Sequence, residues 1–334
     1  MKPPQNNKYR YFILFLSLLV SCNNSKLYNT NNTKKEMDIK EKALERYTIR
    51  DKVLTATILT KGAELSSLKT TKLEYIWQAD PKVWPRHSPI LFPIVGRLVD
   101  HEYTYNGNTY PMKQHGFARD NDFYVIEHTS NSITFEQTST DASKINYPFE
   151  FILQVKYTLQ KNILNVEYTV KNPSDKQDLY FSIGAHPAFN CPFEPNQKRN
   201  EYQLVFDKDI SPKANINING LYEGNTVSVF NKKGIMDLPD NIFDMNSLTF
   251  NPNPFSKVTF VHRPSQKKYV SVSFKNFPFL GIWSTDKQSK FVCIEPWHGI
   301  ADRKDHNKDF THKEGIIKLP PHQNFACSFS IEIL

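Results

Sequence analysis

Apolar and polar residues alternate most strictly between residues 151 and 170. In FILQVKYTLQ (151–160), every second residue from Phe151 to Leu159 is apolar, and those between Leu153 and Leu159 are polar. After Lys161-Asn162, the same spacing resumes from Leu164 to Val170. A period of two residues is typical of a strand with one buried face, so this stretch predicts an antiparallel hairpin.

Other segments carry the same pattern. YVSVSF (269–274) and CSFSIEIL (327–334) alternate similarly, and Asn106-Gly107 is a turn signal. Long amphipathic segments with helical spacing are absent from the sequence, which argues against parallel βαβ units. We therefore predict the all-β class, with a large antiparallel β-sandwich and few short helices. One such helix is predicted over MDIKEKALER (37–46).

The N-terminal pattern is different. A basic start is followed by the apolar run YFILFLSLLV (11–20), which is too short to span a bilayer, and then by Ser21-Cys22. Leu19-Val20-Ser21-Cys22 is similar to a bacterial lipobox. This predicts a lipoprotein signal peptide (1–21), a polar lipid-anchored tether (22–46) and a folded body (47–334). Lipid on Cys22 would hold the protein to a membrane of the cell envelope, periplasmic or surface-facing. An ordinary secretory signal is the alternative.

Composition narrows the partners. The formal net charge is +8, but Lys and Arg form no long basic runs, so no nucleic-acid partner is expected. Besides Cys22, the chain has Cys191, Cys293 and Cys327; one disulfide is compatible with this count, and its pairing is left open. A CxxC pair and a glycine-rich phosphate loop are absent from the sequence.

Two titratable residues stand out among apolar and proline residues. His186 precedes Pro187, which biases it toward an extended conformation at a strand end and suits a general acid. Glu295 follows the apolar residues 291–294 and precedes Pro296-Trp297, so desolvation should raise its pKa and make it a better base. The alternatives are a core histidine with satisfied hydrogen bonds and a glutamate in a buried ion pair.

Several neighbouring residues have two interpretations each. Trp84 suits either a sugar-stacking groove or the core. Trp297 suits either a shield over Glu295 or the core, and Arg119 suits either an ion pair or a solvated surface. The cluster of His298, Asp302, Asp305 and His306 lacks a tetrahedral zinc spacing, so no metal site is predicted.

Six segments together resemble a known family. They are SPILFPIVGRL (88–98), YPMKQHGFAR (110–119), IGAHPAFNCP (183–192), FDMNSLTF (243–250), CIEPWHGIADR (293–303) and KEGIIKLPP (313–321). In order and spacing they are similar to the aldose 1-epimerase (mutarotase) family, and most closely to its LacX-like branch. The resemblance extends from about residue 50 to the C-terminus.

This resemblance implies a galactose mutarotase-like β-supersandwich and the interconversion of α and β anomers of a free hexose, without metal or organic cofactor. It implies that His186 is the general acid and Glu295 the general base. His115 would bind near the ring oxygen, while Arg97 and Asp244 would bind sugar hydroxyls. The match is weaker around Asp244, because Asn246 stands where LacX-like relatives typically carry a second aspartate.

Two other functions remain open. A non-catalytic sugar-binding lipoprotein of the same fold would be free to lose His186 or Glu295, and both are present. A hexose-6-phosphate epimerase would need a basic pocket for the phosphate, and an envelope location disfavours phosphosugars. The sequence does not define the oligomeric state.

Overall fold

The alternating segment 151–170 forms the hairpin that its pattern predicts. In the computed structural model, which describes residues 45–285 and 289–334, β9 (Ile152–Gln160) pairs with β10 (Ile163–Lys171). Leu153, Val155 and Leu159 are fully buried, because their face of the hairpin is turned toward the core. Lys161, at φ 57°, begins the two-residue connection.

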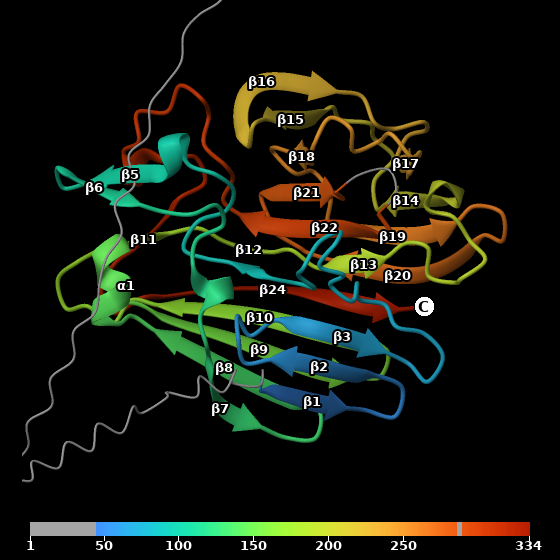
Figure 1. The fold of residues 1–334 in the computed structure, drawn as a ribbon, viewed down its shortest axis with the longest axis horizontal. Coiled ribbons are helices and arrows are strands. Elements are labelled where there is room, and N and C mark those ends of the chain that lie inside the picture. The colour runs from blue at the N-terminus through green and yellow to red at the C-terminus, as the bar shows by residue number, and fades with distance from the viewer. Residues whose placement is uncertain (1–44, 286–288) are drawn as a thin grey trace, which may run out of the picture. The chain divides into compact units, whose positions relative to one another are not determined.

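This hairpin belongs to a nine-stranded sheet in the described part of the chain, and Figure 1 shows β7 to β10 and β24 side by side within it. Every ladder in this sheet is antiparallel. The strands lie in the order β17 (Ile235–Asp237), β14 (Tyr202–Phe206), β19 (Lys257–His262), β20 (Lys267–Ser273), β24 (Asn324–Ile333), β10, β9, β8 (Ser132–Thr138) and β7 (Tyr124–His128). The alternating segments at 269–274 and 327–334 thus supply neighbouring strands, as expected.

A second antiparallel sheet of the described residues carries the candidate chemistry. Its strands lie in the order β16 (Leu221–Val227), β15 (Ala214–Ile218), β18 (Leu248–Phe250), β21 (Phe279–Trp283), β22 (Phe291–His298), β12 (Ile183–Ala185) and β4 (Ile90–Leu91). An eighth strand, β13 (Ala188–Asn190), also pairs with β22. Consequently β22 borders both β12 and β13, on either side of His186 and Pro187.

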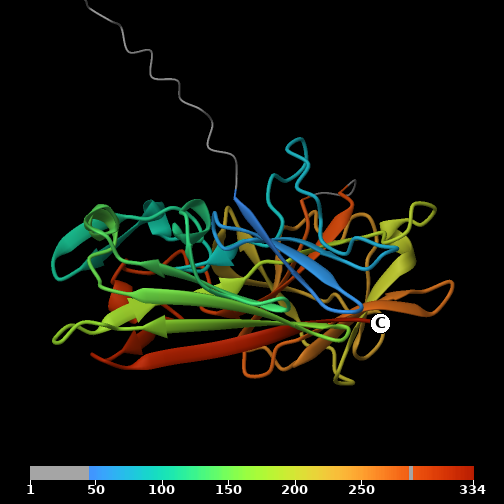
Figure 2. The ribbon, with the colours of Figure 1, turned by 90° about the horizontal axis from the view of Figure 1, so that it is seen from below.

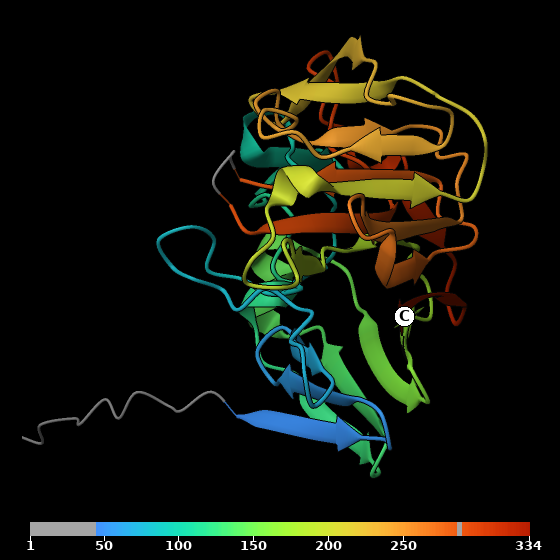
Figure 3. The ribbon, with the colours of Figure 1, turned by 90° about the vertical axis from the view of Figure 1, so that its right-hand side faces the viewer.

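The two large sheets pack face to face and bury aromatic side chains between them. Phe189 of β13 lies 5.6 Å from Phe260 of β19, measured between ring centroids, and Phe206 of β14 lies 5.8 Å from Phe250 of β18. Figure 3 shows the yellow to orange strands of residues 200–300 gathered at one end of this body. The structure is therefore the antiparallel β-sandwich that the sequence predicts.

Smaller elements complete the described chain. They are β1 (Arg46–Arg50), β2 (Thr55–Leu59) and β3 (Leu65–Lys69) in one sheet; the pairs β5 (Glu102–Tyr105) with β6 (Asn108–Pro111) and β11 (Leu179–Phe181) with β23 (Ile317–Leu319); helix α1 (Asp141–Asn146); and 3₁₀ turns at Val99–His101, Ala118–Asp120, Arg199–Glu201 and Phe310–His312. Asn106-Gly107 makes the predicted turn between β5 and β6, with both residues at positive φ.

The three-stranded sheet β1–β3 lies over the green strands of the nine-stranded sheet, as Figure 2 shows. Tyr157 of β9 donates a hydrogen bond of 2.7 Å to the carbonyl of Ala63, and Tyr47 of β1 packs edge-on against Phe135 of β8. These contacts join the start of the body to the hairpin strands.

The predicted N-terminal features fall largely outside the described residues. The signal peptide (1–21), Cys22 and the tether up to residue 44 lie there. The helix expected over 37–46 is wrong at its last residue, because Arg46 begins β1. None of the described helices has the length and apolar character needed to cross a membrane.

Candidate active site

The pairing of three strands places His186 opposite Glu295. Gly184 of β12 pairs with Trp297 of β22, and Ala188 of β13 pairs with Cys293 of the same strand. His186 and Glu295 are the midpoints of these two intervals. Residues opposite each other in an antiparallel register project from the same face of the sheet. The histidine and the carboxylate are therefore brought together by strand register, although 109 positions separate them in the sequence.

The two side chains meet at the wall of a cavity. The Nε2 of His186 lies 3.1 Å from the Oε2 of Glu295, and the side chains are 8% and 2% exposed. The Nδ1 of His186 has no hydrogen-bond partner within the described residues, and Oε2 of Glu295 has no contact of this kind other than the one with Nε2 of His186. Buried polar atoms are normally paired, so the unpartnered Nδ1 is compatible with a site for a polar ligand.

Burial sets the protonation of this pair. Desolvation lowers the pKa of His186 to about 3, and the nearby charges of Arg119 and Arg86 act in the same direction. Desolvation also raises the pKa of Glu295 well above its ordinary range. Both shifts favour the uncharged forms, namely a neutral imidazole beside a protonated carboxyl. The pair then holds one exchangeable proton, and moving it to the histidine would create the imidazolium–carboxylate form.

Trp297 forms part of the cavity wall beside Glu295, and glycines on both neighbouring strands make room for its ring. A Cβ added to Gly184 of β12 would lie 2.5 Å from the indole Cδ1. A Cβ added to Gly281 of β21 would lie 2.5 Å from the opposite edge of the ring. Trp297 and Glu295 project from the same face of β22, so the indole also shields the carboxylate from water.

Two further tryptophans enclose His186. Trp84 stacks on the imidazole at 5.1 Å between ring centroids, with an angle of 25° between the planes. Trp283 meets the same ring edge-on at 5.5 Å. These contacts hold the ring in one orientation and contribute to its desolvation. Trp84 and Trp297, each left with two interpretations, both line the cavity.

His115 is held by reciprocal bonds to Gly96. The N–H of His115 donates to the carbonyl of Gly96 at 2.8 Å, and the N–H of Gly96 donates to the Nδ1 of His115 at 3.1 Å. Because Nδ1 accepts, Nε2 carries the proton in the neutral ring. Burial lowers the pKa of His115 well below its ordinary value, so the neutral form prevails. His115 thus carries an N–H at Nε2, which lies 3.1 Å from the side-chain amide of Gln114, and its ring lies edge-on to His186 at 5.7 Å.

Arg97 lines the cavity beside the turn between β15 and β16. Its guanidinium donates a hydrogen bond of 2.6 Å to the carbonyl of Asn219, in the Asn219-Gly220 turn between β15 and β16. Both turn residues have positive φ, as a two-residue hairpin turn of the type favoured by Asn-Gly requires. The Nε of Arg97 is buried without a partner. One donor of the guanidinium is therefore free to bind a ligand.

The cavity brings most of the predicted residues together. Its volume is about 590 Å³, which is within the range of small-molecule sites. Of the five predicted site residues, His186, Glu295, Arg97 and His115 line it. The other lining residues are Trp84, Pro85, Arg86, Gly96, Gln114, Arg119, Asn217, Asn219, Gly220, Tyr222, Asn246, Ser247, Trp283, Thr285, Trp297 and Ala301.

Asp244 is the exception. It is exposed on a turn before β18 and is absent from the cavity wall, which Asn246 and Ser247 of the same turn reach instead. The expectation that Asp244 lies in the sugar site is therefore not met by this structure. Asn246, at φ 75°, turns the chain so that it contributes a neutral amide.

Positive charge dominates the described wall. Three arginines line the cavity, whereas Glu295 is the one carboxylate among its lining residues. Arg86 forms an ion pair with Asp120 at 2.8 Å, and Arg119 donates to the carbonyl of Gln114 at 2.7 Å. Burial and the adjacent Arg86 lower the pKa of Arg119 to about 10, which leaves it charged at neutral pH.

One group of potential metal ligands occurs among the described residues. His186, Cys293 and Glu295 place their ligand atoms within 4.8 Å of one another, and all three are buried. The predicted cluster of His298, Asp302, Asp305 and His306 does not form such a group in the described structure. Cys191, Cys293 and Cys327 are all free thiols, so the disulfide left open by the sequence is not formed between them.

The sequence interpretation missed much of the second wall. Asn217, Asn219, Tyr222 and Ser247 come from β15, the turn that follows it, β16 and the turn before β18, in that order. Asn219-Gly220 is the same turn signal as Asn106-Gly107, so the hairpin was detectable. Its place beside Arg97 was not detectable, because that contact crosses 122 positions of sequence.

Comparison with known proteins gives consistent matches over this body. Residues 45–313 match the model of a family described as aldose 1-epimerase. The chromosomal protein LacX of Lactococcus lactis subsp. lactis is 33% identical over 297 residues, covering 86% of this chain and 98% of LacX. A galactose mutarotase related enzyme from Lactobacillus acidophilus has 35% identity and a TM-score of 0.80, covering 87% of this chain and 97% of its own. A galactose mutarotase-like protein from Lactobacillus casei has 30% identity and a TM-score of 0.81, covering 87% and 100%.

Proposed function

Because the chain belongs to the aldose 1-epimerase family, we propose that it interconverts the α and β anomers of a free aldohexose by acid–base ring opening. The main support is the buried pair of His186 and Glu295, whose Nε2 and Oε2 atoms lie 3.1 Å apart at the cavity wall. The ring oxygen and the anomeric hydroxyl are bonded to the same carbon. An acid and a base side by side are therefore suitably placed to reach both oxygens.

The proposed steps conserve protons. The imidazolium of His186 donates its proton to the ring oxygen while the bond from this oxygen to the anomeric carbon breaks. The carboxylate of Glu295 removes the proton of the anomeric hydroxyl, which becomes the aldehyde carbonyl. Rotation about the bond to the next carbon turns the aldehyde, and the reverse transfers close the ring on its other face. Ring opening leaves a neutral histidine and a protonated glutamate, which are the forms that burial favours.

The other lining residues would orient the sugar. His115 would donate its Nε2–H to an oxygen near the acid, and Arg97 would donate its free guanidinium hydrogens to other hydroxyls of the sugar. Trp84, Trp283 and Trp297 would provide apolar surfaces for the ring and exclude water. The proposed reaction uses only groups of this chain.

Polarimetry of freshly dissolved α-D-glucose and α-D-galactose tests the proposal. The body 47–334 should accelerate the approach to anomeric equilibrium above the buffer rate. His186→Asn and Glu295→Gln should each reduce the enzymatic rate by about 10²–10⁴-fold, as expected for the loss of a general acid or base. Matched controls are His312→Asn and Glu314→Gln, which alter the same residue types at exposed positions outside the cavity.

Two results would contradict the proposal. Wild-type protein that binds an aldose saturably without accelerating its anomerisation would indicate a carbohydrate-binding protein of the same fold. Acceleration that survives both substitutions would assign the proton transfers to other residues.

The second candidate substrate is a hexose 6-phosphate, and the arginines favour it. Arg119 forms no ion pair with a carboxylate in the described residues, and it lies in the same cavity wall as Arg86. A phosphate would supply the missing negative charge. Glucose and glucose 6-phosphate should be compared on wild-type and Arg119→Met protein. If wild-type protein has a lower KM for glucose 6-phosphate than for glucose, and Arg119→Met removes this difference, the phosphate ester is the favoured substrate. Equal KM values for the two sugars on wild-type protein would favour the free sugar.

We also propose that lipid on Cys22 holds the enzyme at the bacterial cell envelope. The support is the sequence Leu19-Val20-Ser21-Cys22 after an apolar run and a basic start. Full-length protein should be recovered in the membrane fraction, and Cys22→Ala should release it or leave it unprocessed. Equal membrane recovery of a Cys22→Ala protein whose signal peptide has been removed would contradict the anchor.

A further inference from the structure

Asp302 makes contact with both chain segments that form the wall of the cavity around Arg97. Its backbone N–H donates to the carbonyl of Arg97 at 2.9 Å, and its own carbonyl accepts from the N–H of Tyr222 at 3.0 Å. Its carboxylate Oδ2 accepts from the N–H of Val99 at 3.1 Å. Asp302 is therefore bonded to the backbone on both sides of Leu98 and to β16.

The carboxylate of Asp302 is held in turn by Lys313. The Nζ of Lys313 lies 3.0 Å from Oδ1 of Asp302 and also donates to the carbonyl of Ile300. Both side chains are almost fully buried, at 2% and 1% exposed. A buried ion pair of this kind must satisfy its hydrogen bonds to be tolerated, and here both carboxylate oxygens have donors.

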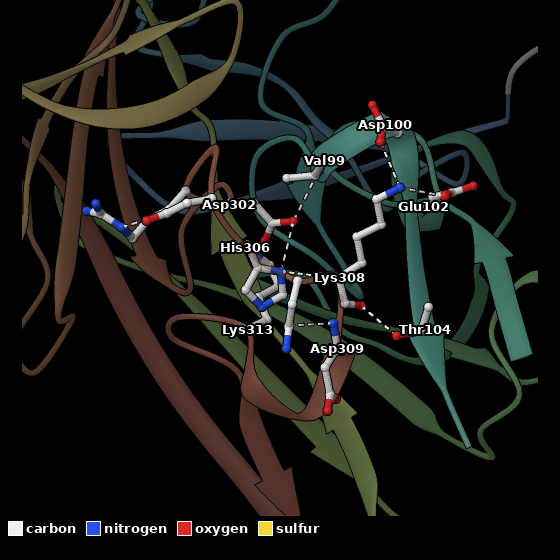
Figure 4. Close-up of polar contacts among 12 residues, drawn as sticks. Val99, Asp100, Glu102, Thr104, Asp302, His306, Lys308, Asp309 and Lys313 are labelled. Carbon is white, nitrogen blue, oxygen red and sulfur yellow. Dashed lines mark hydrogen bonds and ion pairs between the residues drawn. The ribbon is translucent and has the colours of Figure 1, made fainter. Parts of the chain in front are cut away.

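The same loop is bonded to the segment after Arg97 at further points. Figure 4 shows the carboxylate of Asp302 beside Val99 and His306, and the ammonium of Lys308 between Asp100 and Glu102. Lys308 lies 2.7 Å from Asp100 and 2.8 Å from Glu102, but these are partly exposed pairs. Asp302 is the buried contact among them and the one next to Arg97.

The residue before Asp302 packs tightly against the residue before Arg97. A Cβ added to Gly96 would lie 2.4 Å from the Cβ of Ala301, so the two segments touch immediately beside Asp302. Arg97, Tyr222, Gly96 and Ala301 all line the cavity, whereas Asp302 does not. A change at Asp302 can therefore alter the cavity only by displacing these neighbours.

We propose that Asp302, held by Lys313, is a positioning residue that sets Arg97 and Tyr222 for sugar binding. This inference rests on the proposed function. Arg97 is placed to bind hydroxyls rather than to transfer protons, so loss of its position should weaken binding more than turnover. The contacts of Asp302 with the backbone reach Arg97, Val99 and Tyr222.

Asp302→Asn is the sharpest substitution, because both partners of the carboxylate are donors. An asparagine has one acceptor oxygen and one NH₂ group, so it must turn a donor toward either Val99 or Lys313. We expect KM for the aldose, and Kd measured by quenching of the cavity tryptophans, to rise roughly tenfold, as for one lost hydrogen bond to a charged group. We expect kcat to change less than twofold. Asp305→Asn, in the same loop but exposed, should leave all three values unchanged.

A double-mutant cycle separates positioning from general destabilisation. In the Arg97→Ala background, Asp302→Asn should cost less binding than it does in wild type, because the part of its effect that passes through Arg97 is already lost. Lys313→Met added to Asp302→Asn should recover part of the affinity, since the amide oxygen can then face Val99. This double variant also serves as the test if Asp302→Asn alone does not fold.

The outcomes distinguish the two proposals. Unchanged KM and Kd with a lower melting temperature, or fully additive losses in the Arg97→Ala background, would overturn the role of Asp302. Wild-type protein that binds an aldose without turnover would overturn the catalytic proposal alone, and Kd would still test Asp302. Wild-type protein that neither binds nor converts an aldose would overturn both.

Discussion

At the scale of single residues, the central feature is a histidine and a glutamate that share one exchangeable proton. Each side chain would be ordinary on a surface, where the imidazole takes up a proton near pH 6.5. Burial under Trp84, Trp283 and Trp297 opposes charge on both groups. A sugar that replaces the missing solvation would allow the charged forms needed to start the reaction.

The pH dependence of kcat/KM should reflect this coupling. Activity needs one proton on the pair, so the acid limb marks the uptake of a second proton. Since burial lowers the pKa of His186 to about 3, this limb should lie well below pH 6.5. Since burial raises the pKa of Glu295, loss of the shared proton should begin well above the ordinary range of a carboxyl. Buffer-corrected polarimetry from pH 4 to 9 should therefore show a broad plateau.

An acid limb near pH 6.5 would contradict this interpretation, because it would indicate a solvated imidazole that titrates independently. The control is His312→Asn, which removes an exposed histidine and should leave the profile unchanged.

Candidate site residues could be recognised where their immediate sequence neighbours distinguish them. His186 before Pro187 and Glu295 before Pro296-Trp297 were recognisable because strand ends and apolar neighbours are local properties. Asp244 was placed wrongly relative to the cavity because a one- or two-residue difference within a turn decides which side chain faces inward. Asp302 stood out only as a member of a possible metal cluster and Lys313 only within a family-like segment, since their mutual burial depends on packing.

At the scale of elements, the site depends on the position of β22, which pairs with β21 on one side and with β12 and β13 on the other. Pro187 interrupts the edge between β12 and β13, and Gly184 and Gly281 leave space for Trp297. The strands themselves were predictable from their pattern. Their neighbours in the sheet were not, because a period of two residues defines a face without naming the partner strand.

Gly281→Ala tests this arrangement. Its φ is outside the positive range, so the added methyl acts by contact with the indole of Trp297 and not through backbone strain. Overpacking should lower the free energy of unfolding by about 1–3 kcal/mol. Anomerisation should slow as well, since Gly281 is paired with Glu295. Thermal melting and polarimetry measure the two effects.

A smaller ring at position 297 provides the control. Gly281→Ala should cost less stability when it is introduced into Trp297→Phe protein than when it is introduced into wild type, because the smaller ring leaves room for the added methyl group. Equal stability of Gly281→Ala and wild type would show that the indole moves aside without cost.

At the scale of the whole molecule, stability comes from the apolar faces of the two large sheets without a disulfide among the described cysteines. Cys191 and Cys293 are fully buried, and burial raises the pKa of Cys327 to about 12. Their thiols are therefore protonated and poorly reactive in the folded state.

The body 47–334 should melt at the same temperature with and without a reducing agent. A thiol reagent should label it slowly when folded and at all three cysteines when denatured. A melting temperature that falls on reduction would instead indicate a disulfide.

The all-β class and the sandwich were predictable because strand alternation recurs through most of the body. The two-sheet arrangement and the position of β1–β3 were less accessible, since they depend on contacts such as Tyr157 with Ala63 across 94 positions. The N-terminal signal was inferred from a basic start, an apolar run and a lipobox-like motif, and its interpretation stays a prediction.

The opposition of His186 and Glu295 across adjacent strands has a consequence for redesign. Strand pairing within the sheet fixes the positions of His186 and Glu295. Arg86, Asn219 and Asn246 instead belong to surface turns, which tolerate substitution. A new sugar preference could therefore be selected by randomising Arg86, Asn219 and Asn246. The His186–Glu295 pair would be inherited unchanged, so under the proposed function such a library would vary sugar recognition and leave the proton-transfer groups in place.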